Sequence, residues 1–135
     1  MLKRSLGLLT LALACALLAG CGAAASLFSS PSPFVGTWSG AFTESSASRT
    51  GTLSMTVTKA GLVAGILTTN ANVTGPVTGQ IVGSGAATIT MALPNDKFTC
   101  KGGVNINALM QLKGTFTDTG GSQASGVSQI TLSKQ

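Results

Sequence analysis

From Phe34 onward, hydrophobic and polar residues alternate with a period of two along most of the chain. The alternation is clearest in five segments: FVGTWSGAFT (34–43), GTLSMTVTK (51–59), AATITMAL (86–93), MQLKGTFT (110–117) and SQITLSK (128–134). Because successive side chains of a strand point to opposite faces, this period predicts half-buried β-strands. Weaker forms of the pattern predict further strands near 62–69, 77–82 and 97–106.

The alternation also predicts which face of each strand is buried. The inward set contains Phe34, Trp38, Phe42, Leu53, Met55, Val57, Ile89, Met91, Leu93, Met110, Leu112, Phe116, Ile130 and Leu132. Trp38 could line a ligand cavity, but Gly36 and Gly40 beside it leave room for its ring, so we favour a plug within the core. Short strands with such bulky inward side chains favour a filled interior over a hollow one.

The strands are separated by the turn signals KAG, GSG, PND and TGG, and no helical period follows residue 33. Three similar triplets, Gly36–Trp38, Gly79–Ile81 and Gly114–Phe116, suggest strands that open alike in a chain of hairpins whose ends meet. About eight antiparallel strands can form an up-and-down barrel or a β-sandwich, and closure removes exposed edges. We expect an all-β domain over residues 34–135, and favour the barrel.

The first 33 residues have a different pattern. A basic start, Met1–Arg4, precedes an apolar run, Leu6–Leu18. This run is shorter than the roughly 20 residues of a membrane span and is typical of a secretory signal peptide, here residues 1–20. The small residues and prolines of 21–33 predict a flexible tether.

The end of the apolar run, Leu18-Ala19-Gly20-Cys21, resembles the lipobox of bacterial lipoproteins. The resemblance implies cleavage between Gly20 and Cys21, diacylglycerol on the Cys21 sulfur and usually an acylated new amino terminus. Each buried acyl CH₂ contributes about 0.8 kcal/mol, so two or three chains form a lasting anchor. The alternative is an ordinary signal peptide cleaved near residues 23–25. Cys15 lies within the run and would be removed in either case.

The triplet GTW, Gly36–Trp38, on the first predicted strand resembles the G-x-W of the calycins, the lipocalin and avidin group. The resemblance implies a barrel with a tryptophan plugging one end. Two features depart from it: Lys134 stands where lipocalins carry an arginine, and the chain has one Trp and no Tyr, whereas avidins need several of these residues for biotin. Biotin binding is therefore not implied.

Composition narrows the possible chemistry. The chain is 8% charged and has no histidine, so Ser/His/Asp and Cys/His catalysis and histidine-based metal sites are excluded. Without Lys3 and Arg4 of the leader, six basic residues face three acidic ones, with no cluster suited to nucleic acid. We expect no catalytic residue, no metal and no cofactor.

The remaining candidates have simple structural explanations. Glu44, Asp96 and Asp118 lie in or beside predicted turns, so we expect solvating charges or turn formers. Cys100, on the same face as Phe98, is expected to be a small buried residue, with an intermolecular bridge as the alternative. The glycosylation-like triplet at residues 72–74 is expected to be accidental.

These patterns predict a bacterial envelope lipoprotein, exported and held on a membrane by lipids such as palmitate. Gly22, where an aspartate would favour inner-membrane retention in lipoproteins, points to the outer membrane if the cell has one. We expect a non-enzymatic structural or interaction module with an envelope protein partner. The alternative is a lipocalin-like carrier that binds a small hydrophobic ligand inside the barrel.

The lipobox makes a direct prediction. Wild-type protein should incorporate a fatty-acid analogue during metabolic labelling, and Cys21→Ala should not, because the acceptor sulfur is gone. Equal labelling of the two proteins, or none in the wild type, would contradict the assignment of Cys21.

Overall fold

The computed structural model of the chain describes residues 32–121 and 126–135. The predicted signal peptide, Cys21 and the tether up to residue 31 lie outside the described residues. The described residues form strands and turns without a helix. Accordingly, no helix among them is long and apolar enough to cross a membrane.

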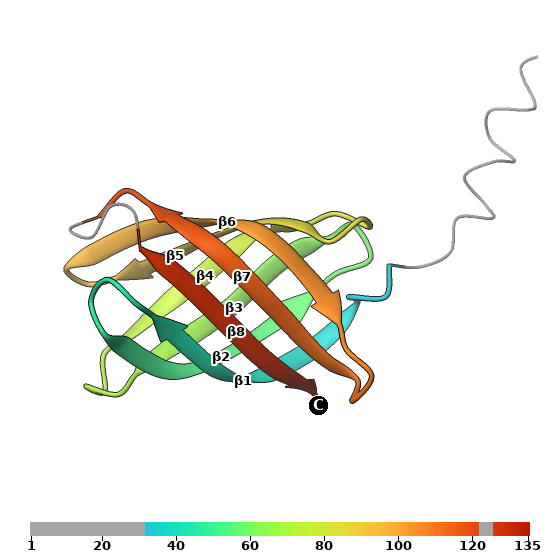
Figure 1. The fold of residues 1–135 in the computed structure, drawn as a ribbon, viewed down its shortest axis with the longest axis horizontal. Helices are drawn as coiled ribbons and strands as arrows, with labels where there is room; N and C mark the ends of the chain where they lie inside the picture. Colours follow the sequence, from blue (N-terminus) through green and yellow to red (C-terminus); the bar gives the residue numbers. More distant parts are fainter. Residues whose placement is uncertain (1–31, 122–125) are drawn as a thin grey trace, which may run out of the picture. The chain divides into compact units, whose positions relative to one another are not determined.

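Eight antiparallel strands form one closed barrel in which every strand pairs with its sequence neighbours (Figure 1). The strands are β1 Gly36–Glu44, β2 Arg49–Val57, β3 Leu62–Thr69, β4 Thr74–Ile81, β5 Ala86–Leu93, β6 Asp96–Ile106, β7 Gln111–Thr119 and β8 Val127–Lys134. The all-β prediction, the up-and-down barrel and the three strands predicted from weaker patterns are thereby confirmed, and the sandwich alternative is wrong.

The barrel closes between its first and last strands. β1 pairs with β8 from Trp38 opposite Lys134 to Glu44 opposite Ser128. The predicted reason for closure is wrong in one respect, because the three similar triplets do not open strands alike. Gly79 lies near the end of β4 and Gly114 in the middle of β7, so only Gly36 begins a strand. Closure comes from the β1–β8 register instead.

Side chains alternate between a packed interior and an outer wall rich in threonine. The largest fully buried side chains come from every strand except β6: Trp38, Phe42, Leu53, Met55, Leu67, Ile81, Ile89, Met91, Leu112, Phe116, Ile130 and Leu132. Strand β6 adds the buried Phe98, Cys100 and Val104. The Phe116 ring takes the space beside Gly114, where a Cβ would lie 2.7 Å from the Phe116 Cζ. The interior is therefore filled by side chains, as predicted.

One inward assignment is wrong. Met110 was predicted to face the core, but its side chain is 67% exposed. Buried and exposed residues do alternate along β7, which follows Met110. Met110 itself lies in the β6–β7 turn, one residue before β7 begins, and its φ is +58°. A turn residue does not follow the pleat of the strand, so the period of two does not apply to it.

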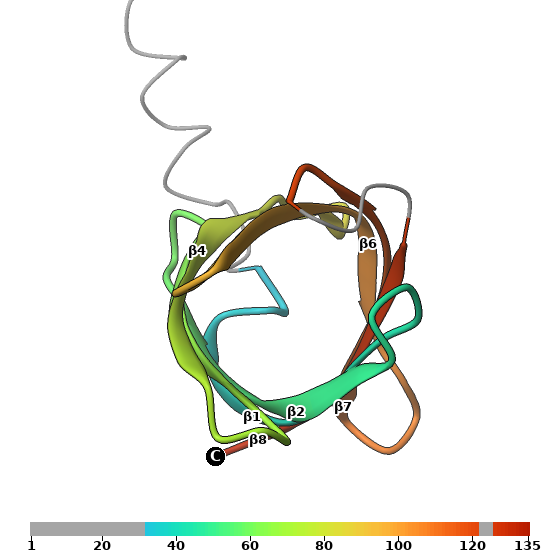
Figure 2. The same ribbon diagram turned by 90° about the vertical axis from the view of Figure 1, so that its left-hand side faces the viewer.

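The two ends of the barrel differ. We call the end with residues 32–35 and the turns 58–61, 82–85 and 107–110 the tryptophan end, and the opposite end the acidic end. At the tryptophan end, Trp38 Nε1 donates to the Phe34 carbonyl oxygen at 2.7 Å, and Lys134 Nζ lies 5.6 Å from the centre of the indole ring. Figure 2 shows residues 32–35, in cyan, folding across this opening. The indole, 1% exposed, closes it as a plug.

The burial of Trp38 predicts that truncation of its side chain strongly lowers the stability of the barrel. Trp38→Ala should lower the free energy of unfolding in urea by roughly 3–5 kcal/mol, because it empties a large packed volume and orphans a hydrogen-bonded carbonyl. Thr37→Ala, one residue away on the outer wall, is the matched control and should change it by less than about 0.5 kcal/mol. Small, equal losses in both variants would contradict the plug.

Candidate functional site

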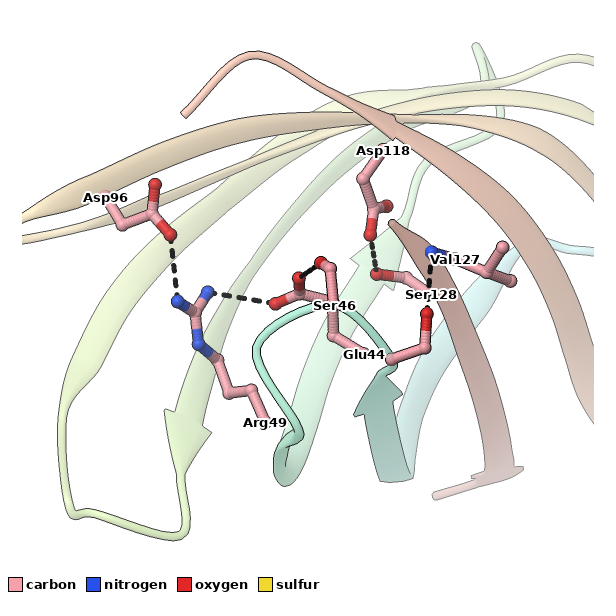
Figure 3. Close-up of polar contacts among 8 residues, drawn as sticks. Glu44, Ser46, Arg49, Asp96, Asp118, Val127 and Ser128 are labelled. Atoms are coloured by element: carbon pink, nitrogen blue, oxygen red, sulfur yellow. Dashed lines mark hydrogen bonds and ion pairs between the residues drawn. The ribbon is translucent and has the colours of Figure 1, made fainter. Parts of the chain in front are cut away.

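Glu44, Asp96 and Asp118, far apart in sequence, meet at the acidic end (Figure 3). Glu44 ends β1, Asp96 begins β6, and Asp118 is the penultimate residue of β7. In an up-and-down barrel the ends of odd-numbered strands and the starts of even-numbered ones lie at the same end, which brings the three together. Glu44 is 4% exposed and Asp118 is 1% exposed. The expectation of solvating charges is therefore wrong for these two residues.

Arg49 is the cation of this cluster. As the first residue of β2, it pairs directly with Glu44 across the first hairpin. Its Nη1 lies 3.2 Å from Glu44 Oε2, and its Nη2 donates to Asp96 Oδ2 at 2.8 Å. The guanidinium carbon also lies 5.3 Å from the centre of the Phe98 ring, within cation–π range. Arg49 thus links the β1–β2 hairpin to β6 across the barrel end.

The β1–β2 turn is fixed from both sides. The Ser46 hydroxyl donates to Glu44 Oε1. Ser45 exchanges two hydrogen bonds with Val127 at the start of β8: its backbone N–H donates to the Val127 carbonyl at 2.9 Å, and its Oγ accepts from the Val127 N–H at 3.1 Å. These bonds hold the turn beside the β1–β8 seam.

A second buried group lies deeper, on β6, β7 and β8. The Ser128 hydroxyl donates to Asp118 Oδ2 at 2.7 Å, and Cys100 lies opposite Asp118 in the β6–β7 register. The other Asp118 oxygen, Oδ1, is buried without a hydrogen-bond partner among the described residues. Cys100 is fully buried, as predicted, but its surroundings are polar as well as apolar.

The surroundings of Cys100 suppress thiol chemistry. Burial, together with the hydrogen bond and the charge of Asp118, raises the pKa of the Cys100 thiol far above its ordinary value. The thiolate is the nucleophilic form, so Cys100 stays unreactive in the folded barrel. Its burial also leaves no access for the intermolecular bridge that the sequence had left open.

A cleft opens beside Arg49 at the acidic end. Its volume is about 410 Å³, and it is lined by residues of the β1–β2, β3–β4 and β5–β6 connections and the adjoining strand ends. Arg49 and Asp96 line it together with the polar side chains of Ser48, Asn70 and Asn95. A second depression of about 370 Å³ lies along Glu44, Arg49 and the start of β8. Both are open surface hollows, and apolar side chains of Ala71, Val73 and Leu93 line the first beside its polar groups.

The arrangement does not resemble a metal centre. Among residues 32–121 and 126–135, no group of three or more Cys, Asp or Glu side chains is placed to hold a metal ion.

Trp38 and Phe116, which the sequence analysis named as a possible ligand site or core plug, are both buried and belong to the packed interior. Gly20 and Cys21 lie outside the described residues.

Comparisons with protein-family models, with curated protein sequences and with solved structures find no match.

The ion pairs predict that Arg49 stabilises the acidic end. Arg49→Met should lower the free energy of unfolding by roughly 2–4 kcal/mol, because it leaves the buried Glu44 carboxylate without its cation. Adding Glu44→Gln should recover part of this loss, since it removes the stranded charge. Both are measured by urea unfolding.

The matched control is Lys97→Met, which removes an exposed cation from the residue after Asp96. It should change the free energy of unfolding by less than about 0.5 kcal/mol. An Arg49→Met loss no larger than this, or no recovery on adding Glu44→Gln, would contradict a stabilising role for the ion pairs.

Proposed function

We propose that this chain is an exported, lipid-anchored protein of the bacterial envelope whose barrel is a non-enzymatic interaction module. The leader and lipobox at Cys21 support the anchor. The chain enters the barrel at the tryptophan end, where Phe34 packs beside Trp38. The acidic end is the opposite one, so it faces the aqueous compartment when the anchored end rests near the membrane.

The filled interior is the observation that carries this proposal. Large apolar side chains from all eight strands occupy the space that a carrier would leave for its ligand. The alternative, a small hydrophobic ligand inside the barrel, gains no support from such an interior. Recognition is therefore assigned to the outside of the barrel, and the cleft beside Arg49 at the acidic end is the candidate surface for it.

The cleft suggests the chemistry of its partner. Ser48, Asn70 and Asn95 offer hydroxyl and amide groups that both donate and accept hydrogen bonds, and Arg49 and Asp96 offset each other's charge. Ala47, Ala71, Val73 and Leu93 line the same cleft, so a segment of an envelope protein that combines apolar side chains with uncharged polar groups fits this lining. We expect no catalysis, because Cys100 is buried away from the cleft and the chain has no histidine.

The calycin relationship also stays a proposal. The Trp38 plug at one end of the barrel supports it. Lys134, whose Nζ lies 5.6 Å from the centre of the indole ring, stands where lipocalins carry an arginine and so departs from the resemblance.

Site-specific photo-cross-linking in intact cells tests the interaction module. A photoreactive residue at Asn70, in the cleft, should capture a discrete envelope protein. The same residue at Thr88, exposed on the outer wall of β5, is the control and should not capture it. Adding Asn95→Lys should abolish capture from position 70, because the longer charged side chain obstructs the cleft without entering the core.

Equal capture from both positions, or capture that Asn95→Lys leaves unchanged, would contradict a partner in the cleft. Protein purified from native membranes should carry no stoichiometric small molecule beyond its own acyl chains. A stoichiometric apolar ligand in its mass spectrum would favour the carrier alternative.

A further inference from the structure

The β6–β7 turn at the tryptophan end exposes two adjacent large hydrophobic side chains. Leu109 is 77% exposed and Met110 is 67% exposed, more than any other large hydrophobic residue that the structure describes. Single exposed apolar residues are common on protein surfaces, but a projecting pair at a hairpin tip is typical of a contact surface. Leu62 and Val82, near two other turns of the same end, are exposed as well.

The tip is held rigidly in this conformation. The Asn107 Oδ1 accepts from the Leu109 N–H at 3.0 Å and from the Gln111 N–H at 2.9 Å. The Asn107 Nδ2 donates to Gln111 Oε1 at 3.0 Å, and the Met110 N–H donates to the Asn107 carbonyl at 3.0 Å. These bonds present Leu109 and Met110 to solvent in an ordered turn.

Met110 adopts a backbone conformation that favours glycine. Its φ of +58° lies in the left-handed region, where a side chain brings strain that glycine avoids. A glycine would relieve this strain and also remove an exposed apolar surface. Met110 thus combines a strained backbone conformation with a large exposed apolar side chain, and burial of that side chain against a partner would offset the cost of its exposure.

The charged side chains that the structure describes at this end have one sign. Exposed Lys59 lies in the β2–β3 turn, Lys113 in β7 near the tip, and Lys134 at the end of β8. None of the described side chains at the tryptophan end is acidic, because Glu44, Asp96 and Asp118 all lie at the acidic end. Lysines around exposed apolar side chains match the interface of an anionic bilayer, which takes up apolar groups and attracts cations.

We propose that the tryptophan end docks on an anionic lipid bilayer, with Leu109 and Met110 inserted at the level of the headgroups. The proposal rests on the lipid anchor of the proposed function, because the chain enters the barrel at this same end. Anchor and tip would then hold the barrel upright with its acidic end away from the membrane. With the lipid anchor alone, nothing in this arrangement would fix the orientation of the barrel relative to the membrane.

The lipidated protein in vesicles allows a selective probe. With Cys15 removed, Cys21 acylated and Cys100 buried, a cysteine introduced by Met110→Cys is the reactive thiol for a polarity-sensitive fluorophore. Thr88→Cys on the outer wall and Asn70→Cys at the acidic end are the matched controls. The vesicles contain phosphatidylglycerol in phosphatidylcholine, or phosphatidylcholine alone, with brominated acyl chains as quencher.

On phosphatidylglycerol vesicles, the probe at position 110 should shift to the blue and be quenched several-fold more than the probes at 88 and 70. Lys59→Gln with Lys113→Gln should reduce this quenching towards the value on phosphatidylcholine alone. Leu109→Ser should reduce it on both kinds of vesicle, because it removes inserted apolar surface.

Co-flotation with the vesicles separates failure of the tip from failure of the anchor. Protein that floats while the three probes are quenched equally overturns the docking proposal and leaves the anchor standing. Protein that does not float overturns the anchor and the docking together. A probe at 110 that shifts to the blue without vesicles indicates a second copy or another protein as the occupant, and overturns the bilayer as partner.

Discussion

Closure of the sheet between β1 and β8 is the constraint on which the rest of the structure depends. With the register fixed from Trp38–Lys134 to Glu44–Ser128, every strand has two neighbours and no edge remains open. Closure gives each strand one inward and one outward face, so a one-residue slip would turn the apolar set to solvent. It also fixes which residues meet at each end: Glu44, Asp96 and Asp118 come together only because β1, β6 and β7 belong to one ring.

The acidic end shows how the fold accommodates charge in a packed interior. Burying a carboxylate is costly unless a cation or hydrogen-bond donors accompany it. Glu44 has Arg49 and the Ser46 hydroxyl, and Asp118 has the Ser128 hydroxyl on one oxygen. The apolar interior supplies the stabilising burial, while these pairs fix the β1–β2 turn beside the seam. Buried ion pairs often contribute less to stability than well-packed hydrocarbon of similar volume, so the main effect of this pair is to hold the turn in place.

Much of the barrel was predictable from sequence, because the period of two is a local property of each strand. Even the buried carboxylates follow it: Glu44 is two residues after Phe42, and Asp118 is two residues after Phe116. Extending the alternation by one step would have placed both inside. The contact of Arg49 with Asp96 was not predictable in this way, because it joins β2 to β6 through closure. Met110 was misplaced since the end of a hairpin turn, set here by Asn107, is not encoded in the period.

In the arrangement that we propose, the filled barrel acts as a spacer between two ends with different roles. β1 has nine residues, so at a rise of about 3.3 Å per residue and the tilt usual for closed barrels it spans roughly 20–25 Å along the axis. In the proposed arrangement this length separates the Lys-rich tryptophan end, at the bilayer, from the cleft beside Arg49. The distribution of charge favours the same polarity, because an anionic surface attracts the exposed Lys59, Lys113 and Lys134, whereas at the acidic end Arg49 is already paired with Glu44 and Asp96. Under this proposal, the orientation at the membrane is set by the side chains at the two ends of the folded barrel.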